Sequence, residues 1–177
     1  MTKDQNFLKS HYPDDVIKKA KQIELLAFDV DGVLTDGGLY YDHEGNELKK
    51  FFAQDGHGIK IVQSIGIEIM IISGRQAACV DHRAQELGIR YVVQGSRDKL
   101  KSFYDQNISI PLEKVCFVGD DTVDVGILNS VGLSVVVPNS NPTIDIKQFD
   151  WVTKRNGGYG AIRDVCDLIY FSKTLNE

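Results

Sequence analysis

The sequence has few of the residues that mark specialised protein classes. It contains only 3 cysteines in 177 residues, Cys79, Cys116 and Cys166, and none of them belongs to a Cys-x-x-Cys pair. A disulfide framework or a thiolate zinc site therefore has almost no support, and we expect buried free thiols. The 4 prolines and 16 glycines are scattered, with no run that would act as a linker between domains.

Long hydrophobic runs and an excess of basic charge are also absent. No stretch approaches the roughly 20 apolar residues of a membrane span, and the polar start of the chain lacks the apolar core of a signal peptide. Against 25 Asp and Glu there are only 20 Lys and Arg, a net charge of −5, which disfavours nucleic acid and anionic lipid as partners. We expect a cytoplasmic protein without a nucleic-acid or membrane partner.

The composition that remains is typical of a packed domain, with 42% hydrophobic and 25% charged residues. We predict a single domain over residues 1–177 with a core from about 13 to 170. Short apolar runs predict strands at 25–30, 67–72, 91–93, 115–118, 133–137 and 151–153. Helical patterns lie between them, at 58–65, 76–87, 98–106, 122–131 and 160–171. This alternation indicates an α/β fold with a doubly wound, Rossmann-like parallel sheet.

Residues 38–52 depart from this alternation. Apolar and polar residues alternate there around Glu44-Gly45-Asn46, a turn signal between two strand-like arms. We predict a β-hairpin that projects after the first strand.

Polar residues gather directly after the predicted strands, where an open α/β sheet binds its ligands. In chain order these residues are Asp29 and Asp31, then Ser73 and Arg75, then Lys99, and finally Asp120, Asp121 and Asp124. Clustered carboxylates repel one another unless a cation lies between them, and hard oxygen ligands select Mg²⁺. An aspartate beside a bound Mg²⁺ can attack phosphorus while a lysine and a hydroxyl hold the phosphoryl oxygens. Any one of these residues could be a helix cap or a solvated charge, but the ordered set favours a phosphoryl-transfer site.

The order DxDG, SGR, lysine and GDDxxD resembles the haloacid dehalogenase superfamily of phosphatases with an aspartate nucleophile. The resemblance implies that Asp29 is the nucleophile and a metal ligand. It implies that Asp31 is the general acid and base, with a backbone carbonyl that also binds the metal, and that Asp120 is a further ligand. The implied cofactor is Mg²⁺.

The same resemblance assigns the remaining motif residues. Ser73 and Lys99 would contact the phosphoryl group. Asp121 and Asp124 would lie beside the metal ligands and hold them in place. Residues 37–72 have room only for the hairpin, one helix and one strand, so the chain looks like a member without a cap domain. In such members another subunit covers the site, which implies a homo-oligomer, specifically a homotetramer.

Two longer segments narrow the resemblance. LTDGGLYYDHEGNELKKFFAQDGHGI and GGYGAIRDVCDLI are similar to the family of phosphatases that act on 3-deoxy-D-manno-octulosonate 8-phosphate, in lipopolysaccharide sugar biosynthesis. The likeness covers residues 24–169 and implies substrate contacts from Asp31, Phe52, Ala53, Gln54, Asp55, Gly56, Lys60, Arg75, Arg83 and Lys99. The cationic members suit a sugar acid that carries both carboxylate and phosphate. Lys60 and Tyr159 stand where some relatives are expected to have arginine.

Three alternative functions stay open at this stage. The first is a phosphatase for a nine-carbon sugar acid 9-phosphate of the sialic-acid type, because both substrates share a 2-keto-3-deoxy acid end. The second is a receiver-like phosphorylation switch, although a receiver would place its phosphorylated aspartate after the third strand, where this chain has Lys99. The third is a catalytically silent scaffold, which the intact set of Asp29, Asp31, Lys99 and Asp120 disfavours.

Overall fold

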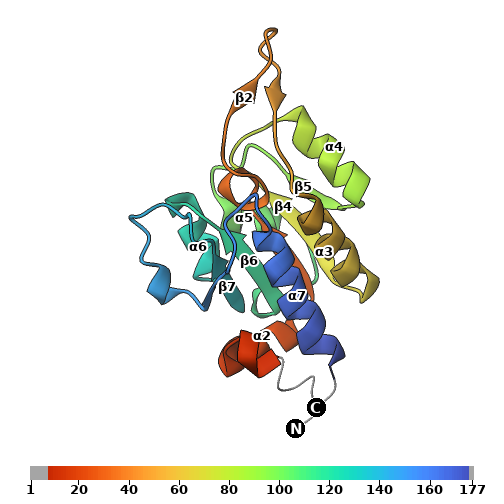
Figure 1. The fold of residues 1–177 in the computed structure, drawn as a ribbon, viewed down its shortest axis with the longest axis vertical. Coiled ribbons are helices and arrows are strands. Elements are labelled where there is room, and N and C mark those ends of the chain that lie inside the picture. The colour runs from red at the N-terminus through yellow and green to blue at the C-terminus, as the bar shows by residue number, and fades with distance from the viewer. Residues whose placement is uncertain (1–7, 176–177) are drawn as a thin grey trace.

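The computed structural model describes residues 8–175, and its centre is a six-stranded parallel sheet (Figure 1). The strand order is β5-β4-β1-β6-β7-β8, with β1 at Leu25–Phe28, β4 at Glu68–Ile72, β5 at Tyr91–Val93, β6 at Val115–Gly119, β7 at Leu133–Val136 and β8 at Trp151–Val152. Every neighbouring pair is parallel. The predicted doubly wound α/β fold is therefore confirmed, and each predicted strand agrees with an observed one to within two residues at either end.

Helices cover both faces of the sheet. One face carries α2 (Asp14–Gln22), α3 (Ala53–Ser64), α4 (Ala78–Leu87) and α7 (Ala161–Thr174), which share a buried apolar cluster with the strands. The other face carries α5 (Lys99–Asp105) and α6 (Val125–Leu128). Three short helical turns, η2 (Leu112–Lys114), η3 (Thr122–Asp124) and η4 (Ile146–Gln148), complete the connections. Since both faces are covered, strands β1, β6 and β7 are buried at every position, and Ser134 of β7 is their one polar residue.

The helix boundaries differ from the predictions at several places. Helix α3 begins at Ala53 instead of residue 58. Gly56 and Gly58 both lie inside the helix, and side chains of α4 and α7 approach the helix at these two glycines. A Cβ on Gly56 would lie 2.3 Å from Arg83 Nη2, and one on Gly58 would lie 2.8 Å from Arg163 Cδ. The predicted helix 122–131 is shorter, with only η3 and α6 in its place, and α2 was not predicted.

The predicted hairpin is present as β2 (Tyr40–Tyr41) and β3 (Glu47–Leu48), and Figure 1 shows it projecting beyond the end of the sheet. A further bridge between Thr35 and Phe51 closes its base. Only the hairpin lies between the loop after β1 and the start of α3, so no cap domain is inserted there. Within residues 8–175, no helix combines the length and the hydrophobicity needed to cross a membrane.

Candidate active site at the carboxyl edge of the sheet

The strand order places the candidate site at the carboxyl ends of three adjacent strands. Strand β1 lies between β4 and β6, so the sheet runs outward from it in both directions. In open α/β sheets, ligands bind beyond the carboxyl ends of the strands at such a switch point. Asp29 follows β1, Ser73 follows β4, and Asp120 follows β6. The three sequence motifs therefore meet at one edge, as predicted.

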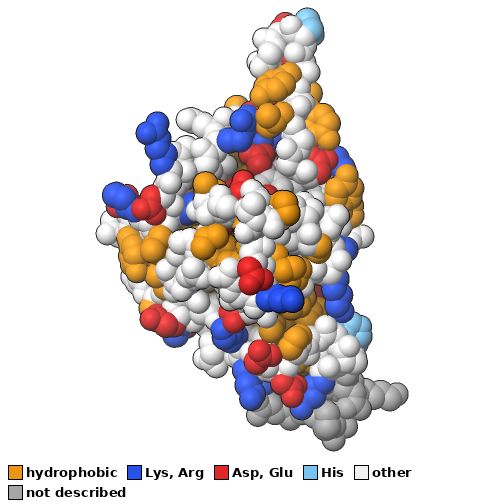
Figure 2. Space-filling model, turned by 90° about the vertical axis from the view of Figure 1, so that its left-hand side faces the viewer, with side chains coloured by type: hydrophobic (Ala, Val, Ile, Leu, Met, Phe, Trp, Pro, Cys, Tyr) orange, Lys and Arg blue, Asp and Glu red, His pale blue; other side chains and the backbone are white. Residues whose placement is uncertain are grey.

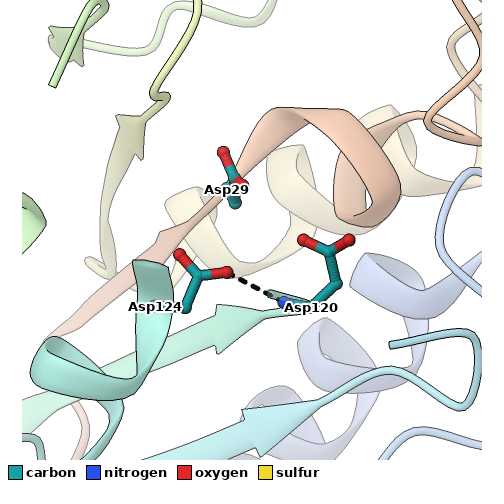
Figure 3. A group of neighbouring side chains, drawn as sticks. All are labelled: Asp29, Asp120 and Asp124. Atoms are coloured by element: carbon teal, nitrogen blue, oxygen red, sulfur yellow. Dashed lines mark hydrogen bonds between the residues drawn. The ribbon is translucent and has the colours of Figure 1, made fainter. Parts of the chain in front are cut away.

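Asp29, Asp120 and Asp124 form an acidic cluster, shown in Figure 3, with one oxygen of each within 4.8 Å of the others. Buried Lys99 lies against this cluster, with its Nζ 2.8 Å from Asp29 Oδ2 and 2.5 Å from Asp124 Oδ1. Three carboxylates against one ammonium leave a net charge of −2 when all are ionised. A divalent cation would neutralise that charge.

The side chains of Asp124 and Asp121 form hydrogen bonds within the loop after β6 and to Asn141. Asp124 Oδ2 accepts hydrogen bonds from the backbone N–H groups of Asp120 at 2.9 Å and Asp121 at 3.1 Å. The Asp121 carboxylate caps η3 and accepts from Asn141 Nδ2 at 2.8 Å. Asp124 therefore fixes the backbone at Asp120, and Asp121 fixes the turn that follows it. Support of the metal ligands by these two residues stays a prediction.

Asp120 shows how the site fits a metal ion. Its Oδ1 is buried and has no hydrogen-bond partner among the described residues, and burial, together with the charges of Asp29 and Asp124, raises its pKa to about 8. A Cβ on Gly32 would lie 2.1 Å from Asp120 Oδ2, so glycine, at φ +87°, leaves room beside the carboxylate. An unpartnered buried carboxylate oxygen beside a second carboxylate, that of Asp29, fits a hard cation such as Mg²⁺.

Asp29 is held in a defined orientation at the start of an irregular helical turn, η1 (Val30–Leu34). Its Oδ1 accepts the Val30 N–H at 2.6 Å, and its Oδ2 faces Lys99. Burial raises the pKa of Asp29 to about 6, although Lys99 opposes the shift. The backbone on one side and an ammonium on the other thus hold this carboxylate in one orientation.

Asp31 lies on the side of the site nearest the hairpin, and Ser73 follows β4. Asp31 Oδ1 contacts Lys49 Nζ, and its Oδ2 lies 3.6 Å from Arg75 Nε. The hydroxyl of buried Ser73 accepts the Arg75 N–H at 3.2 Å.

Comparison with known proteins identifies the family of this chain. Residues 99–164 match the family described as haloacid dehalogenase-like hydrolases. The chain is 45% identical over 161 residues to 3-deoxy-D-manno-octulosonate 8-phosphate phosphatase of Escherichia coli strain K12, with 90% of this chain and 85% of that protein covered. The chain belongs to the 3-deoxy-D-manno-octulosonate 8-phosphate phosphatase family.

Solved structures of this phosphatase family have the same fold. The phosphatase from Yersinia pestis superposes with a TM-score of 0.87 at 41% identity, covering 90% of this chain and 87% of that one. The phosphatase from Moraxella catarrhalis was solved with a magnesium ion, a phosphate ion and a KDO molecule. It superposes with a TM-score of 0.86 at 39% identity, covering 92% of this chain and 94% of that one.

Several residues that the family resemblance implies as substrate contacts lie near this edge of the sheet, and their contact with substrate stays a prediction. Residues 52–56 form the start of α3, directly after the Thr35–Phe51 bridge, with Ala53 and Gln54 exposed. Arg83 on α4 lies against Gly56, and Arg75 lies beside Asp31.

Lys60 is the exception among these residues. Helix α3 runs opposite to the strands, so Lys60 lies toward the other edge of the sheet. There it lines a hollow with Glu68, Gly88 and Arg90 at the amino end of β4. It is not brought to the site with the other residues, and its contact with the substrate stays a prediction.

Sequence reasoning missed two charged residues of the site, Glu47 and Lys49. Both lie on the returning arm of the hairpin, and the side chain of Lys49 is 1% exposed. Along this arm half-buried and exposed positions alternate from Glu47 to Phe51, the period of a strand with one inward face. The alternation appears only in the structure, because the outward Leu48 is apolar while the inward Glu47 and Lys49 are charged. The sequence pattern therefore carried no signal for the two residues.

The carboxylate of Asp55 is buried between α3 and the start of α7. Its Oδ1 accepts the N–H of Arg163 at 2.7 Å, while its Oδ2 has no hydrogen-bond partner among the described residues. Arg155 adds a second link, since it donates to Gln54 Oε1 at 2.9 Å and pairs with Asp164. The start of α3 is therefore tied to α7, and the predicted contact of Asp55 with substrate stays a prediction.

Asp55 makes the stability of the protein depend on pH. Burial raises its pKa to about 6, above its ordinary value of 3.8. The folded state binds the Asp55 proton more tightly than the unfolded state does. Protonation therefore stabilises the folded state fully below about pH 4, and this stabilisation is lost as the pH rises through 6. We expect Asp55→Asn to remove this component, which accounts for about 2 kcal/mol of the change in unfolding free energy between pH 4 and 7. Denaturant titrations at the two pH values measure this difference, and the exposed variant Asp105→Asn is the control. If the unfolding free energy of Asp55→Asn changed between the two pH values as much as that of the parent, the assignment would be contradicted.

Proposed function

We propose that this chain is a Mg²⁺-dependent phosphatase that hydrolyses 3-deoxy-D-manno-octulosonate 8-phosphate to 3-deoxy-D-manno-octulosonate and phosphate. The observation that carries the chemistry is Lys99 bridging Asp29 and Asp124, beside the unpartnered carboxylate of Asp120. Membership of the phosphatase family supports the choice of substrate. The reaction would belong to lipopolysaccharide sugar biosynthesis.

The first half of the proposed reaction transfers the phosphoryl group to the protein. Asp29 attacks phosphorus, the bond from phosphorus to the sugar oxygen breaks, and Asp31 gives its proton to the departing alkoxide. Lys99 and Ser73 hydrogen-bond the phosphoryl oxygens and hold them in line with the attack. The carboxylates of Asp29 and Asp120 and the carbonyl of Asp31 would hold Mg²⁺, which supplies positive charge to the phosphoryl oxygens.

The second half releases phosphate. Asp31, now ionised, takes a proton from a water molecule as that water attacks phosphorus. The bond between Asp29 and phosphorus breaks, so inorganic phosphate leaves and both carboxyl groups return to their starting states. The buried setting of Asp29 and Lys99 keeps their interactions strong during both transfers.

Recognition of the sugar acid is assigned to the cationic side of the site. Arg75 and Arg83 carry the positive charge that a substrate carboxylate needs. The start of α3 adds backbone N–H groups, because Phe52 at its N-cap makes no side-chain cap.

The test is phosphate release by the purified protein from 3-deoxy-D-manno-octulosonate 8-phosphate and from a nine-carbon sugar acid 9-phosphate, each with Mg²⁺ and with EDTA. We expect a Mg²⁺-dependent preference for the eight-carbon substrate and loss of activity in EDTA. A preference for the nine-carbon compound would keep the mechanism and change the substrate. No release from either compound would contradict the proposal and favour a phosphorylation switch or a silent scaffold.

We further propose a cytoplasmic homotetramer in which a neighbouring subunit covers the site. Large apolar side chains are exposed on the hairpin, at Leu39, Tyr40, Tyr41 and Leu48, and Figure 2 shows hydrophobic side chains on the projecting end of the molecule. An exposed apolar patch of this kind marks an interaction surface. The three free cysteines suit a reducing compartment.

The oligomer can be tested at the hairpin. We expect light scattering to give a tetramer for the parent and smaller species for Tyr41→Asp/Leu48→Asp, because a charge is costly to bury in an interface. Glu44→Gln at the hairpin turn is the control. A monomeric parent, or an unchanged tetramer in the double variant, would contradict this assignment.

A further inference from the structure

Four charged side chains form a closed ring between the hairpin and the site. Lys49 Nζ contacts Asp31 Oδ1 and lies 2.8 Å from Glu47 Oε1. Arg75 Nη2 lies 2.9 Å from Glu47 Oε2, and Arg75 Nε lies 3.6 Å from Asp31 Oδ2. Each carboxylate thus faces one cation with each of its oxygens, and the ring has no net charge when all four groups are ionised.

The hairpin supplies half of this ring from its inward face. Glu47 and Lys49 point inward, whereas Leu48 and Lys50 between and after them are exposed. The side chain of Lys49 is 1% exposed and that of Glu47 is 14% exposed. Burying an ammonium group is costly unless its charge is paired. The ammonium of Lys49 is paired with two carboxylates, those of Asp31 and Glu47.

The ring fixes two groups that the proposed reaction needs. Lys49 holds Asp31 Oδ1, whereas Oδ2 lies 3.6 Å from Arg75 Nε, beyond hydrogen-bond distance. Oδ2 is therefore the oxygen that can carry the proton to a leaving oxygen, and the contact with Lys49 sets its direction. Arg75 is 44% exposed, so its guanidinium remains open to solvent while Glu47 holds one of its nitrogens. The hairpin therefore acts on the site of its own chain, apart from any contact with a neighbouring subunit.

We propose that Lys49 and Glu47 are positioning residues of the phosphatase: Lys49 orients Asp31 for proton transfer to the leaving oxygen, and Glu47 holds Arg75 in place for the substrate carboxylate. The inference rests on the proposed function. It assigns the two tasks to different members of the ring, so the two residues have different kinetic signatures.

The test of Lys49 uses two phosphomonoesters that differ in leaving group. The sugar alkoxide needs a proton from Asp31, whereas p-nitrophenolate is stable without one. We expect Lys49→Met to lower kcat/KM by about 100-fold for the sugar acid phosphate and by less than about 10-fold for p-nitrophenyl phosphate. Lys49→Arg, which keeps the charge and the donors, should recover most of the loss. If Lys49→Met does not fold, Lys49→Gln provides the same comparison.

The test of Glu47 uses the carboxylate of the substrate. We expect Glu47→Gln to raise KM about tenfold for the sugar acid phosphate, with a much smaller rise for p-nitrophenyl phosphate, which has no carboxylate. Glu47→Gln combined with Arg75→Met should cost no more than Arg75→Met alone, since Glu47 acts through Arg75. Glu44→Gln, exposed at the hairpin turn, is the matched control and should match the parent.

The outcomes separate this inference from the proposed function. A parent that hydrolyses neither compound removes the proposed function and the inference with it. An active parent whose Lys49→Met variant loses the same factor on both compounds, or loses nothing, overturns the assignment of Lys49. Equal KM changes for both compounds in Glu47→Gln overturn the assignment of Glu47.

Discussion

Asp29→Asn is expected to lower kcat for phosphate release by about 10⁴-fold or more, because an amide cannot attack phosphorus. The substitution is nearly isosteric and keeps an oxygen that can accept the Val30 N–H. The loss should therefore arise from the chemical step, and thermal unfolding should show a folded protein.

The control for this variant is Asp105→Asn, which makes the same chemical change on the exposed face of α5. It should retain the activity of the parent. Phosphate release by Asp29→Asn within about tenfold of the parent would contradict the role of Asp29 as nucleophile.

Lys99→Met is expected to lower both activity and stability. Lys99 is the only cation in direct contact with buried Asp29 and Asp124 in the described part of the chain. Removing it leaves two buried carboxylates without a cationic partner, which costs about 3–5 kcal/mol of unfolding free energy at pH 7. The phosphoryl group also loses a donor, so kcat should fall by about 100-fold or more.

Denaturant unfolding and phosphate-release assays measure the two effects of Lys99→Met. The matched control is Lys101→Met on the same helix, where the ammonium is 69% exposed and pairs with Asp105. An exposed pair of this kind contributes about 1 kcal/mol or less. If Lys99→Met were as stable as Lys101→Met, the bridging role of Lys99 would be wrong.

The sheet and its active edge could be predicted because their physical signals are local. Strands buried on both faces read as continuous apolar runs, and Asp29, Ser73 and Asp120 each directly follow one of them. Lys99 lies further on, at the start of α5 after β5. The start of α3 was mispredicted because glycine lowers helix propensity. In the folded chain Arg83 and Arg163 approach α3 at Gly56 and Gly58. Helix propensity describes only the local sequence, so it does not report these contacts between helices.

Only part of the candidate site could be predicted from the sequence, for a similar reason. Asp29, Lys99 and Asp120 follow motifs at strand ends, whereas Glu47 and Lys49 reach the site only through the path of the hairpin. Their charges looked like ordinary surface charges in the sequence. Only the pairing of Tyr40 with Leu48 and the bridge at the hairpin base define which face of the arm turns inward.

The most direct test of the account is to detect the phosphoryl group on Asp29. The parent is mixed with 3-deoxy-D-manno-octulosonate 8-phosphate and Mg²⁺, quenched within a turnover, and treated with borohydride, which reduces an acyl phosphate to the alcohol. Mass spectrometry of the peptide that contains residue 29 should then show homoserine at that position, and EDTA should abolish it. Phosphate release without any modification of Asp29, or homoserine at Asp31 or Asp120 instead, would contradict the mechanism.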